Sequence, residues 1–213
     1  MAFDYLELLD LEINYKVISR LFGEEIDQAA ADWLLSLGLD DFCDEPLIRR
    51  GAQIIHEKLT KEQPDNYLDL LAAEYAAAFI GTAGSKAAYP YESVYTSPQQ
   101  LVMQKAFEDV RKILNARGVF NDSELYDDHI AIELQYLAYL VEKLRNTEEN
   151  SPEYEPLIED QESFLDDHIH NWVPKFTSQI KASVRSRFYL GAAMMLAGAV
   201  REHDRILRNH RLG

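Results

Sequence analysis

The chain has 213 residues, of which 47% are hydrophobic and 27% charged, the balance of a soluble globular protein with one sizeable core. Asp and Glu number 37 against 21 Lys and Arg, so the formal net charge is -16 at pH 7. A surface with this charge repels nucleic acid and anionic lipid, so neither is expected as a partner. It attracts a basic peptide or protein instead.

The N-terminal half predicts four helices, because apolar residues recur with helical spacing. Gly23 and Gly38 follow the first two, Pro46 suits the first turn of the third, and Asn66 is a candidate N-cap for the fourth. These helices are expected at residues 4–22, 25–37, 46–59 and 66–80.

The C-terminal half predicts five more helices, separated by the irregular stretches 81–97 and 119–126 and a polar connection at 146–151. They are expected at residues 98–116, 127–144, 154–172, 174–180 and 185–209. No alternating β pattern is present, so residues 1–213 predict a single-domain, all-α bundle of about eight to nine helices. The connection at 146–151 would allow either a monomer or a domain-swapped dimer.

The cellular compartment is indicated by what the sequence lacks. Cys43 is the lone cysteine, which fits a reducing environment. The N-terminus has no basic start followed by an apolar run. The most apolar run, 188–200, is shorter than the roughly 20 residues that a membrane span needs. A cytoplasmic protein without stable membrane association is predicted.

Two polar and aromatic clusters stand out from the helical pattern. The irregular stretch carries Tyr89, Tyr91 and Tyr95 beside Pro90, which suits peptide capture because aromatic rings offer contact area at little entropic cost. Alternatively, at least one of these tyrosines folds back onto the core. The second cluster, 127–129, reads Asp-Asp-His. Helix capping by the first aspartate is one interpretation, and an exposed polar mouth for a guanidinium group or a main-chain amide is the other.

Catalytic motifs fit poorly. His129 and Glu133 lie four residues apart on one helical face, but no HExxH and no pair of Glu-x-x-His motifs occurs. His203-Asp204 lacks the downstream aspartate of HD-type phosphohydrolases, and the glycine spacing in 81–86 is wrong for a phosphate loop. No metal site is predicted. The alternative function is a helical metal-dependent hydrolase that uses Asp128, His129, Glu133 and His168.

Three ordered stretches resemble the TorD/DmsD family of redox-enzyme maturation chaperones, within the TorD/NarJ superfamily. The first is EYAAAFIG at 74–81, leading into YPYESVY at 89–95. The second is DHIAIEL at 128–134, and the third is FLDDHIHNWVPKF at 164–176, followed by Phe188-Tyr189. Relatives often have Trp in place of Tyr91, and a proline before the Asp-His pair that this chain lacks.

The resemblance implies an all-helical cytoplasmic chaperone that is not an enzyme and needs no cofactor of its own. Its partners would be the twin-arginine leader peptide and the apo form of a molybdopterin-containing reductase, held until cofactor insertion and export. The third stretch is interpreted as packing. The implied peptide-binding residues are Pro90, Tyr91, Glu92, Ser93, Val94, Tyr95, Asp128 and His129.

The chemistry of such a leader suggests further roles. Glu92 and Asp128 are expected to face the arginines, and a pair between His129 and Asp128 would make binding sensitive to pH. A related alternative is a helper of the kind that acts in nitrate reductase assembly, which binds the N-terminal segment of a subunit that is not exported.

Overall fold

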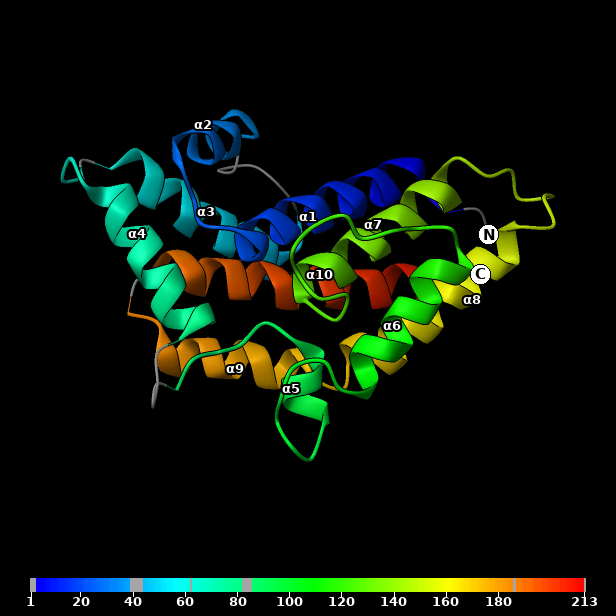
Figure 1. Cartoon of the computed structure of the whole chain (residues 1–213). Coiled ribbons are helices and arrows are strands. Elements are labelled where there is room, and N and C mark those ends of the chain that lie inside the picture. The colour runs from blue at the N-terminus through cyan, green and yellow to red at the C-terminus, as the bar shows by residue number, and fades with distance from the viewer. Residues whose placement is uncertain (1–2, 39–43, 62, 82–85, 186, 213) are drawn as a thin grey trace.

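The computed structural model of the chain describes residues 3–38, 44–61, 63–81, 86–185 and 187–212. Within these ranges the chain forms ten α-helices, two π-helical segments and no strand (Figure 1), which confirms the predicted all-α class. None of these helices is both long and apolar enough to cross a lipid bilayer. Cys43 and residues 82–85 of the first irregular stretch lie outside the described residues.

The elements follow one another along the chain with short connections. They are α1 (Tyr5–Gly23), α2 (Gln28–Ser36), α3 (Pro46–Thr60), α4 (Tyr67–Tyr75), η2 (Ala76–Ile80), α5 (Glu92–Thr96), α6 (Lys105–Ala116), α7 (Ile130–Arg145), α8 (Tyr154–Phe164), η3 (Leu165–Ile169), α9 (Val173–Ser183) and α10 (Arg187–Leu212). Both η segments are π-helical, a form that is rare and often found at functional sites.

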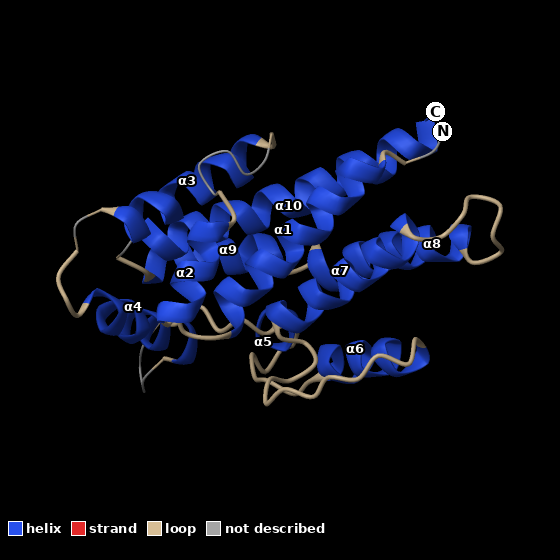
Figure 2. Ribbon diagram, turned by 90° about the horizontal axis from the view of Figure 1, so that it is seen from above, coloured by secondary structure: helices blue, strands red, loops and turns tan. Residues whose placement is uncertain are grey.

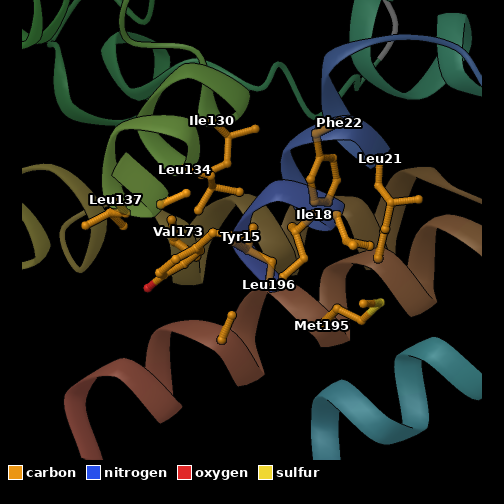
Figure 3. Close-up of a cluster of buried hydrophobic side chains, with 14 of the residues drawn as sticks. Tyr15, Ile18, Leu21, Phe22, Ile130, Leu134, Leu137, Val173, Met195 and Leu196 are labelled. Carbon is orange, nitrogen blue, oxygen red and sulfur yellow. The ribbon is translucent and has the colours of Figure 1, made fainter. Parts of the chain in front are cut away.

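Helix α1 forms the centre of the bundle and packs along both α7 and α10, while α3 and α9 pack against α10 (Figure 2). Figure 3 shows the core between them, where the apolar face of α1 meets side chains of α7 and α10. Tyr15, Ile18 and Phe22 of this face are fully buried. Asp4 caps α1 through hydrogen bonds from the amides of Leu6 and Glu7.

Helices α3 and α10 cross closely because glycines face each other at the contact. A Cβ added to Gly191 would lie 2.8 Å from the carbonyl oxygen of Gly51, and a Cβ on Gly51 would meet the backbone of Gly191 in the same way. Larger residues would therefore force the two helices apart.

Helix α6 begins later than the sequence pattern indicated, at Lys105 rather than Pro98. Gln100 and Met103 have φ values of 54° and 58°, in the left-handed region, which stops a helix from forming across 98–104. The amide of Gln104 donates to the hydroxyl of Ser93 (3.1 Å), so this segment is fastened to α5. The short helix α5 was itself not anticipated.

The predicted cap of the fourth helix is also not formed, since the Asn66 side chain makes no capping hydrogen bond to α4. The helical segment that continues from α4 through η2 nevertheless ends where expected, just before Gly81, whose φ is 76°.

The two ends of the described chain lie side by side, far from α2 and α4 (Figures 1 and 2). The ring of Phe3 stacks on that of His210 with centroids 4.1 Å apart.

Candidate functional site

The tyrosine-bearing linker and the Asp-His pair meet through main-chain hydrogen bonds. The amide of Ile130 donates to the carbonyl oxygen of Pro90 (2.9 Å), and the amide of Glu92 donates to that of Asp128 (2.9 Å). Tyr91 lies between these two bonds and forms an isolated antiparallel β-bridge with His129. Two segments separated by the whole of α6 therefore form one junction.

Asp128 is fully buried in this junction and caps a helix other than its own. Its Oδ2 accepts a hydrogen bond from the amide of Ser93 in the first turn of α5 (2.9 Å). Burial raises the pKa of this carboxyl group, and its Oδ1 has no hydrogen-bond partner among the described residues. The prediction of an exposed polar mouth is therefore wrong, because the carboxylate faces the interior and fastens the linker.

His129 is 1% exposed and is the N-cap of α7. Its Nδ1 accepts a hydrogen bond from the amide of Ala131 (3.0 Å). Burial lowers the pKa of the imidazole to about 3, so the ring is neutral near pH 7 and carries its proton on Nε2. The predicted pair with Asp128 is not formed, and a ring that stays neutral gives no pH sensitivity near neutrality.

Asp127, the residue that the sequence made the candidate cap of α7, does not form this cap. Its Oδ2 accepts from Nε of Arg111 on α6 (3.0 Å), and its Oδ1 accepts from the Asn121 amide (2.9 Å). These bonds fasten the second irregular stretch to α6.

Glu92 is 3% exposed and is bonded on both carboxylate oxygens. Its Oε2 lies 2.8 Å from Nδ1 of His168, and its Oε1 accepts from the side-chain amide of Asn171 (2.9 Å). The expectation that Glu92 and Asp128 face incoming arginines is therefore wrong, because both are buried and bonded within the protein. Glu92 instead ties α5 to η3 and to the turn that precedes α9.

Glu133 is a third buried carboxyl group near this junction. Its Oε2 accepts a hydrogen bond from the indole nitrogen of Trp172 (3.2 Å), and its Oε1 has no partner among the described residues. Burial raises the pKa of Glu133 well above its usual value, and the nearby carboxylates of Glu92 and Asp128 raise it further. The protonated form of Glu133 is therefore favoured in the fold.

The end of α5 packs against the core. The ring of Tyr95 stacks on that of Trp172 (centroids 5.4 Å apart) and meets the ring of Phe176 edge-on at 6.0 Å. Trp172 and Phe176 are fully buried, as their interpretation as packing residues requires. Tyr95 is thus the tyrosine that folds back, and half-buried Val94 donates its amide to the carbonyl oxygen of Tyr91 (3.1 Å) within the same turn.

A groove of ≈ 630 Å³ opens beside the junction. Pro90, Tyr91 and His129 lie in its lining, whereas the other predicted binding residues do not, and Glu92 lines a separate cavity. The full lining is Gly23, Glu24, Glu25, Asp27, Tyr75, Phe79, Ile80, Tyr89, Pro90, Tyr91, Leu125 and His129. Two other cavities, of ≈ 640 and ≈ 670 Å³, have mostly charged or polar linings and suit an apolar ligand less well.

The groove combines aromatic residues with an acidic edge. The aromatic residues, which we call the aromatic floor, are Tyr75, Phe79, Tyr89 and Tyr91. The Tyr75 hydroxyl donates to the carbonyl oxygen of Phe22 (2.8 Å), which holds the start of the floor against the end of α1. Glu24, Glu25 and Asp27 are exposed on the turn between α1 and α2 and form the edge, which we call the acidic rim. An apolar and cationic segment would complement such a surface.

The comparison with known proteins agrees with this geometry. The sequence model of a family described as "Nitrate reductase delta subunit" matches residues 43–178, more than half of the chain. The chain belongs to this family. Within the delta subunit family, the residues matched include the floor of the groove and the whole of the junction.

Curated relatives extend the similarity over most of the chain, and each is named "Chaperone protein TorD". The protein of Photobacterium profundum is 28% identical over 191 residues, covering 89% of this chain and 84% of the relative. That of Aliivibrio salmonicida is 26% identical over 189 residues, covering 85% and 87%. These relatives are named chaperones, which is a non-enzymatic role, so the predictions of a TorD-type chaperone and of a chain that is not an enzyme are confirmed.

The hydrolase alternative receives no support from the arrangement of its residues. In the described part of the chain, no three His, Cys, Asp or Glu side chains are grouped so that they could hold a metal ion. Nδ1 of His129 is bonded to an amide, and Nδ1 of His168 is bonded to Glu92.

The His203-Asp204 dipeptide is structural. His203 is fully buried, with Nδ1 2.9 Å from the Tyr15 hydroxyl and Nε2 2.9 Å from Oε1 of Gln161. Burial lowers its pKa to about 3, so the neutral ring links α1, α8 and α10. Asp204 pairs with His170 at the surface.

Proposed function

We propose that the chain is a cytoplasmic chaperone that binds the twin-arginine leader of a molybdopterin-containing oxidoreductase in this groove. It would hold the leader and the apo-enzyme, and so aid cofactor insertion before export. The observation that supports this most directly is the groove itself, in which an aromatic floor and an acidic rim stand beside the junction of the two family stretches.

The apolar run of a leader becomes helical when it lies in an apolar groove, because its own backbone then satisfies its hydrogen bonds. Phe79, Ile80 and Tyr91 offer it a surface of suitable character. Each apolar side chain that is fully buried there contributes about 2 kcal/mol, so the apolar contacts supply part of the affinity and the charged contacts add to it.

The predicted binding residues divide into two groups under this proposal. Pro90, Tyr91 and His129 contact the leader. The others hold Pro90 and Tyr91, which we call the binding wall, in position through contacts with η3, the start of α7 and the core. These positioning residues are Glu92, Ser93, Val94, Tyr95 and Asp128.

The test uses two exposed apolar residues of one chain segment. Ile80 is 61% exposed in the groove, and Leu70 is 53% exposed on α4 outside its lining. Isothermal titration with the leader of a molybdoenzyme should show binding to the native chain and to Leu70→Glu. Ile80→Glu should bind about tenfold more weakly, since it replaces an apolar contact with a charge.

Equal affinity of Ile80→Glu and Leu70→Glu would remove the groove from the proposal. Absence of binding to any molybdoenzyme leader would refute the function. A leader whose arginines are replaced distinguishes the twin-arginine chaperone from the helper that serves a non-exported subunit. The replacement should weaken binding to the former and leave the affinity of the latter unchanged.

A further inference from the structure

The acidic rim is fixed next to the start of α7. Ile26, in the middle of the turn, is 1% exposed and anchors it in the core. The Ser19 hydroxyl donates to the carbonyl oxygen of Ala131 (2.9 Å), and a Cβ on Gly23 would be in ordinary contact with Cβ of that alanine. The rim and His129 therefore keep a constant relation to each other.

The rim carries uncompensated negative charge. Arg20 is the cation paired with it, with Nη2 3.9 Å from Glu24 Oε2 and 3.7 Å from Asp27 Oδ1. It also donates to the carbonyl oxygens of Glu24 and Glu25. Three carboxylates and one guanidinium leave an excess of two negative charges. Of the described residues that line the groove, none is a lysine or arginine.

A second observation at the same groove points to a peptide. Nδ1 of His129 accepts from a backbone amide, so Nε2 of the neutral ring bears a proton. This nitrogen has no acceptor among the described residues, although the side chain is almost fully buried and lines the groove. A main-chain carbonyl of a ligand in the groove would give this donor an acceptor.

We infer that the acidic rim is the subsite for the adjacent arginines of the bound segment, and that Nε2–H of His129 donates to a main-chain carbonyl close to them. The apolar run then continues over Phe79 and Ile80. This inference rests on the proposed function. It replaces Glu92 and Asp128, which are buried and bonded elsewhere, as the carboxylates that recognise arginine. Guanidinium groups suit this site because their N–H donors pair with carboxylates in a bidentate manner.

The test is a double-mutant cycle on the full chain. The rim variant is Glu24→Gln/Glu25→Gln/Asp27→Asn, in which asparagine retains the cap that residue 27 provides to the amide of Ala30. The probes are two peptides of roughly 20 residues with an apolar stretch of about 10 residues, preceded by Arg-Arg in one and Gln-Gln in the other. The native chain should bind the Arg-Arg peptide about tenfold more tightly, and the rim variant should bind both peptides equally.

A matched control has the same change in net charge at the far end of the molecule. Glu148→Gln/Glu149→Gln/Glu153→Gln lies on the exposed connection between α7 and α8. This variant should keep the tenfold preference. If the rim variant also keeps it while the native chain binds, the rim assignment is overturned and the leader-binding function stands. If the native chain binds neither peptide, the function itself fails.

The histidine is tested separately with His129→Asn, which keeps a cap for α7 but loses Nε2–H. It should bind both peptides about fivefold more weakly and leave the preference for arginine unchanged. In the native chain, the Nε2 proton should become observable by NMR with a downfield shift when peptide is added. An unchanged affinity of the variant, or a proton signal that peptide does not affect, would overturn this hydrogen bond.

Discussion

Asp128 gives the sharpest test of how the binding wall is held. In Asp128→Ala the amide of Ser93, which is itself fully buried, loses its acceptor, and α5 loses its cap. An unpaired buried amide costs about 1–3 kcal/mol, so we expect the free energy of unfolding to fall by about 2–3 kcal/mol. For a chain of this length, the melting temperature should fall by about 5–10 °C.

Asp128→Asn is the matched variant. The amide oxygen still accepts from Ser93, and the NH2 group takes the place of Oδ1, which has no partner to lose. Because burial raises the pKa of Asp128, its ionised form is disfavoured in the fold, and removing the charge should leave stability within about 1 kcal/mol of the native chain.

Urea unfolding followed by far-UV circular dichroism measures the free energy of unfolding of both variants, and titration with the leader measures their affinity for it. Asp128→Ala should bind the leader more weakly because Pro90 and Tyr91 lose their support, whereas Asp128→Asn should bind nearly as the native chain does. If the asparagine variant is as unstable as the alanine variant, the carboxylate acts through its charge and the argument from the hydrogen bond is refuted.

Three further predictions concern the core. Because the pKa of Glu133 is raised in the fold, its contribution to stability is present below the unfolded pKa and is lost as pH rises through the folded pKa. Glu133→Gln should therefore gain stability relative to the native chain between pH 5 and pH 8. Urea unfolding would contradict this if the difference in stability between the two chains were the same at both pH values. His203→Ala leaves two buried partners unpaired and should lower the free energy of unfolding by about 3 kcal/mol without changing leader affinity, so a large change in affinity would argue against a structural role. Gly191→Ala should destabilise by about 2–4 kcal/mol because its Cβ meets the backbone of α3, whereas Gly23→Ala, which has room, should stay within about 1 kcal/mol; equal melting temperatures would refute the close crossing.

The sequence was sufficient for elements whose ends are set locally. The expected helix at 4–22 and the observed α1 at Tyr5–Gly23 agree because Asp4 and Gly23 signal its ends within one turn. Helix α6 was misplaced because the reason for its late start is not local. The amide of Gln104 is bonded to Ser93, a residue of another helix. In addition, Gln100 and Met103 take left-handed conformations, which the sequence does not indicate because neither residue is a glycine.

The candidate site was predicted in its parts but not in its orientation. The two family stretches meet, yet Glu92 and Asp128 face inward, since their partners are a histidine in η3 and an amide of α5 that only the tertiary fold brings near. The residues of the acidic rim were missed because three acids after a glycine look like an ordinary solvated turn. They line the groove because the tertiary fold brings the end of α1 against the start of α7, where Ser19 bonds to Ala131.

The stacking of Phe3 on His210 has a practical consequence for protein engineering. Because the two ends touch, a short linker between them would allow a circularly permuted chain, opened instead in the connection at 146–151. Such a rearranged chain should fold and retain the groove, since none of the groove's lining residues lies near the two ends or in that connection. Affinity tags and fluorophores can be attached at either terminus for the same reason.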